Sequence, residues 1–109
     1  VAYTNAPNSL GPNTAAADLT QPTSTNGYAP IPLAGTWTET NGVVEYDHDG
    51  LGGSPEWTPS GPWSSPVTGI ALIYGTRVLH FVDYDQAGSG TWTAAVGRKL
   101  RVRIKDVLA

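Results

Sequence analysis

The side chains best suited to catalysis or metal binding form three small groups. Asp47-His48-Asp49-Gly50 resembles part of a calcium loop, but the later ligands, above all a terminal bidentate Glu, are absent at the required spacing. His80 lies in an apolar run without a second His, Cys or Glu at ligand spacing. Asp83 and Asp85 share one face of an extended segment and could cleave a glycosidic bond only within a cleft. We interpret the three groups as a solvated acidic turn, a half-buried hydrogen-bonded His and a solvated strand end.

Other catalytic or cofactor motifs are missing from the chain. No Gly-x-Ser-x-Gly elbow, phosphate loop, dinucleotide fingerprint or zinc-ligand spacing occurs. The absence of Cys removes disulfides, thiolate zinc sites and Cys nucleophiles. We therefore expect a protein that is not an enzyme and that has no cofactor or metal.

Aromatic residues favour a binding role as an alternative. The chain has four Trp and five Tyr, and exposed aromatic rings stack on the apolar faces of sugars. Trp57 and Trp63 lie in a loop rich in Pro and Gly, where they either cover the core or form a contact surface. The competing interpretation places Trp37 and Trp92 in the core and Trp57 and Trp63 over one of its open ends.

The elements that would position these groups centre on residues 66–84. Two runs of β-branched and aromatic residues flank Gly75-Thr76, which predicts a β-hairpin with a II′-type turn. Asn41-Gly42 predicts a second hairpin, between an edge strand within residues 28–39 and a short strand at 43–46. We expect Ile31, Leu33 and Trp37 of that edge strand to enter the core, and a further short strand near Trp57.

The last predicted strand covers residues 97–105 and carries most of the positive charge. Leu100, Val102 and Ile104 alternate there with basic residues, which indicates one buried and one positive face. Either acidic neighbours such as Asp83 and Asp85 screen this face, or it contacts another subunit or a protein lattice. The candidate partner contacts in this strand are Arg98, Lys99, Arg101, Arg103 and Lys105, and Trp57 and Trp63 of the preceding loop join them.

Residues 1–29 are predicted to form an extended N-terminal arm. They are poor in large apolar side chains and rich in Pro, Asn, Thr and Ser, so they cannot form a core of their own. Residues 14–19 could form a single helical turn. The arm is either a frayed terminus or a segment that orders against a neighbouring subunit, with Tyr3, Leu10 and Leu19 as its candidate contacts.

Composition sets the fold class and the classes of partner. Thirteen Gly, nine Pro and frequent Thr in 109 residues suit short strands joined by turns. We predict an all-β protein with one antiparallel β-sandwich of jelly-roll or immunoglobulin-like type at residues 30–109, preceded by the arm. The net charge of -3 gives no general attraction to nucleic acid or to anionic membranes, so we expect neither as a partner.

With the strands laid out, residues 27–104 resemble small virion structural proteins of tailed bacteriophages. The resemblance begins with an aromatic turn and a first apolar strand, continues through the central hairpin and ends within the basic strand. The segments that carry it are Gly27-Tyr28-Ala29, a strand ending near Trp37, Val43-Val44, Trp63 before Val67-Thr68-Gly69-Ile70-Ala71-Leu72, Val78-Leu79-His80-Phe81, and Thr93-Ala94-Ala95-Val96-Gly97 before Leu100-Arg101-Val102.

This resemblance implies a compact β domain displayed on a virion. The expected function is that of a capsid decoration (cement) protein, which binds the major capsid protein or another virion protein and forms a homo-oligomer on the particle. A component of the neck, tail or fibre, and a carbohydrate-binding β-sandwich module, are the alternatives. The resemblance brings no catalytic motif with it.

Overall fold

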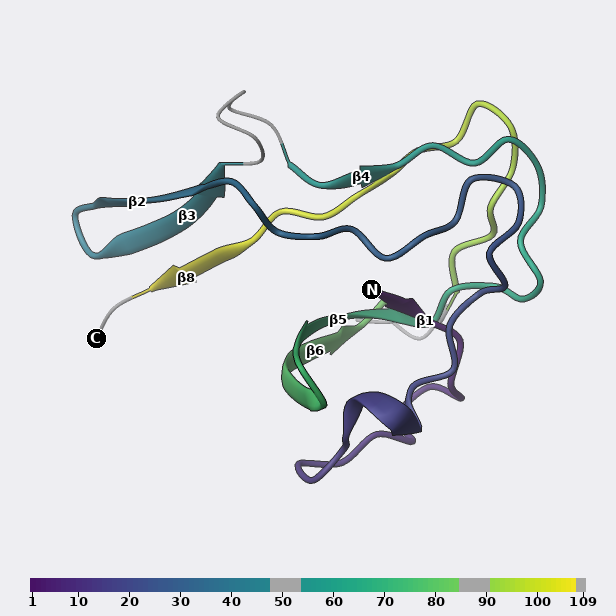
Figure 1. The fold of residues 1–109 in the computed structure, drawn as a ribbon, viewed down its shortest axis with the longest axis horizontal. Coiled ribbons are helices and arrows are strands. Elements are labelled where there is room, and N and C mark those ends of the chain that lie inside the picture. Colours follow the sequence, from purple (N-terminus) through teal and green to yellow (C-terminus); the bar gives the residue numbers. More distant parts are fainter. Residues whose placement is uncertain (48–53, 85–90, 108–109) are drawn as a thin grey trace. The chain divides into compact units, whose positions relative to one another are not determined.

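The computed structural model describes residues 1–47, 54–84 and 91–107. These residues form an all-β protein of small, open sheets, with a single 3-10 turn, η1 (Ala16–Asp18), and no α-helix among them (Figure 1). The chain divides into two compact units. Unit 1 comprises Val1–Pro30 and Thr58–Arg98, and unit 2 comprises Ile31–Trp57 and Lys99–Ala109.

The sheet of unit 1 contains the predicted central hairpin. Its antiparallel strands lie in the order β1-β5-β6, and they are β1 (Ala2–Tyr3), β5 (Gly69–Tyr74) and β6 (Arg77–Asp83). The two-residue turn at Gly75-Thr76 joins β5 to β6. Only Gly75 of this pair has a positive φ, +62°, as the first central residue of a II′ turn requires. The hairpin prediction is therefore confirmed.

The N-terminal segment covers one face of this hairpin. Tyr3 is fully buried and forms a core with Leu19 and Ala71, against which Val78 and Phe81 pack. The predicted helical turn is present as η1. The segment is not a frayed terminus, because a few apolar anchors hold it against its own chain. Its ordering against a neighbouring subunit stays a prediction.

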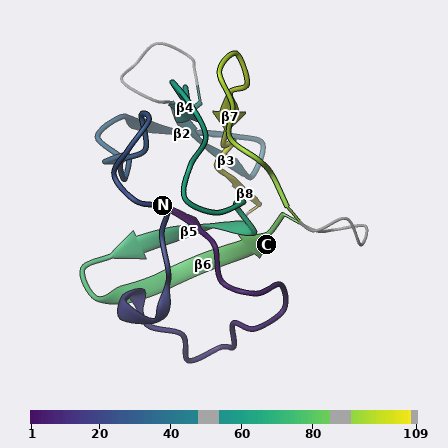
Figure 2. The ribbon, with the colours of Figure 1, turned by 90° about the vertical axis from the view of Figure 1, so that its right-hand side faces the viewer.

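Hydrogen bonds complete this attachment of the N-terminal segment. The amide of Thr4 donates to Thr20 O (2.7 Å), and that of Ala16 donates to Thr76 O (3.0 Å) at the hairpin turn. Thr68 Oγ1 donates to the carbonyl oxygen of Tyr3 (3.2 Å). Figure 2 shows the segment, in purple, running beside β6. Backbone pairing thus supplies the stability that the composition of the segment cannot.

Aromatic side chains form a second packed cluster in unit 1. The Trp63 ring meets Tyr28 edge to face, with centroids 5.0 Å apart, and meets Trp92 at 5.6 Å. Its Nε1 donates to the carbonyl oxygen of Asn26 (3.1 Å), so the buried indole is satisfied. Edge-to-face pairs of this kind anchor the loop that carries Trp63.

Unit 2 contains the second predicted hairpin. Its larger sheet has the order β2-β3-β8, and a short ladder pairs β4 with β7. The bounds of these strands are β2 (Thr36–Thr40), β3 (Val43–Asp47), β4 (Glu56–Trp57), β7 (Leu100–Arg101) and β8 (Lys105–Val107). Asn41 and Gly42 both have positive φ, 54° and 80°, as a type I′ turn requires. The second hairpin and the short strand at Trp57 are therefore confirmed.

Two predictions for unit 2 are wrong. Trp37 does not enter a core. The residue is 50% exposed, and the other four residues of the edge strand β2 are exposed as well. The predicted strand at 97–105 is divided into β7 and β8, which belong to different ladders. The expected alternation nevertheless persists, since Leu100 is buried while Arg101 and Arg103 are exposed.

Candidate partner-binding surfaces

Four basic side chains form a strip on unit 2, which we call the basic strip. Lys99, Arg101, Arg103 and Lys105 occupy alternate positions, and their side chains are 57%, 66%, 71% and 45% exposed. The apolar residues between them turn to the opposite side, since alternate residues of an extended chain face opposite ways. All four were candidate contacts, and the structure brings them together.

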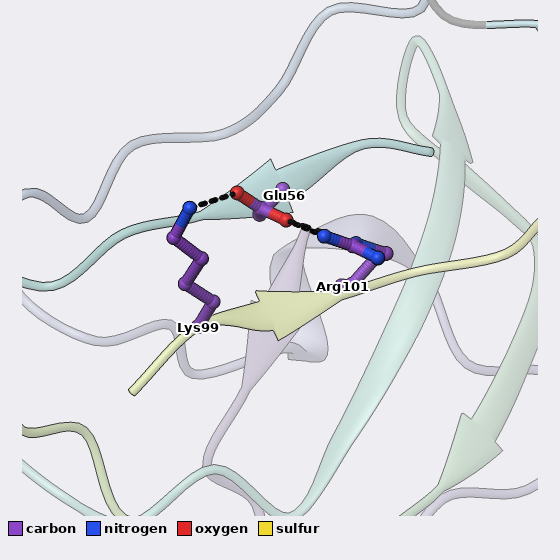
Figure 3. A network of polar contacts seen from close by, with 3 residues as sticks. All are labelled: Glu56, Lys99 and Arg101. Carbon is purple, nitrogen blue, oxygen red and sulfur yellow. Dashed lines mark hydrogen bonds and ion pairs between the residues drawn. The ribbon is translucent and has the colours of Figure 1, made fainter. Parts of the chain in front are cut away.

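Glu56 of β4 pairs with both cations in the first half of the basic strip, Lys99 and Arg101 (Figure 3). Its Oε1 lies 3.3 Å from Lys99 Nζ, and its Oε2 lies 2.8 Å from Arg101 Nη2 and accepts from Arg101 Nε at 2.9 Å. The hydrogen bond from Arg101, followed by the hydrogen bond from Lys99, holds the pKa of the Glu56 carboxyl below its usual value. The register that sets Glu56 opposite Arg101 across β4 and β7 makes this contact possible.

Glu45 of β3 pairs with both cations in the second half of the basic strip, Arg103 and Lys105. Its Oε1 lies 3.4 Å from Arg103 Nη2 and 3.5 Å from Lys105 Nζ. Glu45 stands directly opposite Lys105 in the β3–β8 pairing. Screening of the strip by carboxylates of the same chain is thus observed, although the acids differ from the two that the sequence suggested.

Of those two suggested acids, Asp83 is engaged elsewhere and Asp85 lies outside the described residues. Asp83 Oδ1 accepts from the Tyr3 hydroxyl (2.7 Å) and Oδ2 accepts from the amide of Asn8 (3.0 Å). Burial, together with this hydrogen bond to a carboxylate, raises the pKa of Tyr3 well above its ordinary value. Asp83 therefore anchors the N-terminal segment.

Arg98 is separate from the basic strip. It belongs to unit 1, where its guanidinium lies 5.3 Å from the centre of the Trp92 ring and donates from Nη1 to Thr93 O (3.0 Å). This cation–π contact with Trp92 holds the guanidinium of Arg98 against its own chain. The structure therefore divides the five predicted basic contacts into one stacked Arg and four strip residues.

The other candidate contacts offer little surface to a partner. Tyr3 and Leu19 are buried in the core of unit 1, and Leu10 is partly buried against it. Trp57 and Trp63 are also buried, at 4% and 8% exposed. Neither Trp provides the open ring that stacking on a sugar needs. The interpretation with Trp92 in the core is confirmed, whereas its assignment of Trp37 to the core is wrong.

An apolar surface that sequence reasoning missed lies on the second face of the central hairpin, and we call it the outer face. The cross-strand pairs Ala71–Phe81 and Ile73–Val78 point toward the N-terminal segment, so the alternating pairs point the other way. The outer pairs are Ile70–Val82, Leu72–His80 and Tyr74–Arg77, so the face is apolar along Ile70, Leu72 and Val82 and carries His80 and Arg77 as its polar members. The sequence feature that could have identified this surface is the unbroken apolar run of β5, because a strand with two apolar faces shows no alternation of apolar and polar residues.

The groups considered for catalysis do not assemble into a site. His80 is exposed, contrary to the expected half-buried position, and residues 48–50 of the acidic turn lie outside the described residues. Among the residues that are described, no group of three or more His, Asp or Glu side chains is placed to hold a metal ion.

Over the same ranges, no helix is long and apolar enough to span a membrane.

Comparison with known proteins identifies no related family, protein or structure. The chain matches no protein-family model, no curated protein and no solved structure.

Proposed function

We propose that this protein is a non-enzymatic structural component of a virion, and specifically a capsid decoration protein that binds and stabilises the lattice of the major capsid protein. The observation that supports this proposal is the apolar outer face of the β5–β6 hairpin. Val82 on that face is 45% exposed, and the neighbouring Leu79 at the irregularity in the hairpin is 57% exposed.

Such a face is unfavourable in water and favourable in a protein contact. Each Å² of apolar surface removed from water stabilises a contact by about 25 cal/mol. Large contiguous apolar patches on soluble proteins mark sites of interaction. A repeated lattice would cover the outer face at every copy, which is how a decoration protein adds mechanical stability without turnover.

The predicted β-sandwich of jelly-roll or immunoglobulin-like type also remains a proposal. The β1-β5-β6 sheet has one face covered by the N-terminal segment and one apolar outer face. A second sheet laid on the outer face would complete a sandwich. In the lattice proposal, a neighbouring virion protein supplies that layer.

The test uses purified particles of the source virus and the protein as a full chain. We expect the protein to sediment with the particles at a fixed ratio to the major capsid protein, measured by quantitative mass spectrometry. Val82→Lys should lower occupancy about tenfold, which a loss of about 1.4 kcal/mol produces. Val96→Lys is the matched control, because Val96 is 73% exposed and lies outside the β1-β5-β6 sheet.

Absence of the wild-type protein from the particles would refute the proposed function. Equal loss with Val82→Lys and Val96→Lys would refute the role of the outer face. Cryo-imaging then separates the capsid from the neck, tail and fibre alternatives, because a decoration protein follows the capsid lattice and the others occupy a few axial positions. The carbohydrate-binding alternative has lost its basis in Trp57 and Trp63, which are buried.

A further inference from the structure

We propose that the basic strip binds an extended acidic protein segment that carries carboxylates at alternate residues. The inference deepens the proposed function, on which it rests for the statement that the segment belongs to a lattice protein. It concerns unit 2 alone, whereas the outer face belongs to unit 1. The two surfaces can therefore be tested separately.

The strip retains positive charge after its internal pairing. Lys99 and Arg101 share Glu56, while Arg103 and Lys105 share Glu45. Among the side chains that the structure describes, these four cations contact two carboxylates, an excess of two positive charges within the ion pairs of the strip, in a chain whose net charge is -3. Each shared cation keeps donors available, since Arg has five N–H groups and Lys has three.

The spacing of the strip selects the form of the ligand. Alternate residues of an extended chain repeat every 6.6 Å or so, so the strip spans about 20 Å. An extended partner segment with Asp or Glu at every second residue has the same repeat, and its carboxylates would meet the cations one by one. A helical acidic segment would present its charges at a different spacing.

Overall charge favours an acidic protein segment over nucleic acid. Binding to a nucleic acid relies on many phosphate contacts and on a positive field around the protein. This chain is acidic overall, so a long phosphate backbone would be repelled by the acidic residues beyond the strip. A short segment that contacts the strip alone avoids most of that repulsion.

Glu45 and Glu56 would compete with such a ligand, and this gives the proposal its sharpest test. Both carboxylates contact the same cations that an arriving carboxylate needs. Replacing Glu45 with Gln removes the competitor and keeps the shape of the side chain. The stability cost should be small, because exposed ion pairs contribute about 0 to 1 kcal/mol. Binding should therefore become tighter in E45Q, whereas a purely structural ion pair predicts no gain.

The experiment measures binding of a synthetic Glu-Thr repeat peptide of about ten residues, a length that covers the strip when extended. A peptide of equal composition with its Glu residues in one block, a Lys-Thr repeat and a single-stranded oligonucleotide are the control ligands. The variants are Arg103→Glu and Glu45→Gln. Arg77→Glu serves as the matched charge control, because Arg77 is exposed and lies on β6 of unit 1, whereas the strip belongs to unit 2.

We expect R103E to weaken binding of the Glu-Thr repeat about tenfold, E45Q to strengthen it about threefold, and R77E to change it less than twofold, in low-salt buffer. The proposal is overturned if R103E and R77E behave alike, if E45Q does not tighten binding, or if the block peptide or the oligonucleotide binds better. Particle occupancy is read separately: wild-type occupancy with a failed peptide test refutes the strip alone, and the reverse result refutes the virion function alone.

Discussion

Replacement of Tyr3 by Phe should destabilise the protein at neutral pH. The Tyr3 ring is fully buried, and its hydroxyl donates to the Asp83 carboxylate over 2.7 Å. A hydrogen bond to a charged group contributes about 1.5 to 3 kcal/mol. Because Asp83 keeps its second donor, the amide of Asn8, we expect the lower end, about 1.5 kcal/mol. Phe retains the ring and therefore the apolar packing.

The same hydroxyl gives this loss a pH dependence of defined sign. The folded pKa of Tyr3 is raised above the unfolded value of 10.0, so its contribution is complete below about pH 10 and declines as the pH rises toward the folded pKa. At about pH 11 the unfolded state gains about 1.4 kcal/mol from ionisation of this group. The difference between wild type and Y3F should therefore nearly vanish there. Tyr28, whose pKa is raised to about 12 by burial, titrates in both proteins and cancels.

Urea unfolding followed by far-ultraviolet circular dichroism at about pH 7, 9 and 11 measures this difference. Tyr74→Phe is the control, because Tyr74 is 76% exposed and its replacement should leave the stability at pH 7 nearly unchanged. A stability difference between wild type and Y3F that stays constant from pH 7 to pH 11 would refute the assignment of the Tyr3 hydroxyl to a buried, proton-retaining position.

Three other changes test the packing by the same urea measurement. Gly69→Ala should destabilise by about 2 kcal/mol or more, because a Cβ there meets the Tyr3 hydroxyl and lies 2.6 Å from Val82 O; a stable variant would disprove the close approach. Trp63→Ala should cost about 3 to 5 kcal/mol through loss of its buried ring contacts, and a cost below 1 kcal/mol would contradict its burial. Gly42→Ala should cost about 1 kcal/mol because its φ is +80°, and an unchanged midpoint would contradict the I′ turn.

The two hairpins could be predicted from the sequence because their signals are local. Asn41-Gly42 and Gly75-Thr76 determine their turns through backbone conformations that few residues adopt. The alternation of apolar and basic residues after Leu100 also described the exposed faces correctly. The division of that segment between β7 and β8 was not predictable. The alternation of apolar and basic residues indicates which side chains share a face, but it does not indicate which strand pairs with the segment.

The position of the N-terminal segment could not be read from its composition. Few of its side chains are large and apolar, yet Tyr3 reaches Asp83 across eighty positions of the chain. Gly69 leaves the space into which the Tyr3 hydroxyl fits. Long-range complementarity between one ring and one glycine carries no periodic signal. For the same reason the carboxylates of the basic strip, Glu45 and Glu56, were not identified in advance.

The N-terminal segment also determines how partner binding has to be tested. Tyr3 and Leu19 occupy the face of the hairpin formed by Ala71 and Phe81, so a partner of this sheet has to use the outer face. Deletion of residues 1–30 would uncover the inner face and remove part of the core. Any change in particle binding would then combine unfolding with loss of contact. A substitution on the outer face, such as Val82→Lys, leaves the core in place and therefore reports on the contact itself.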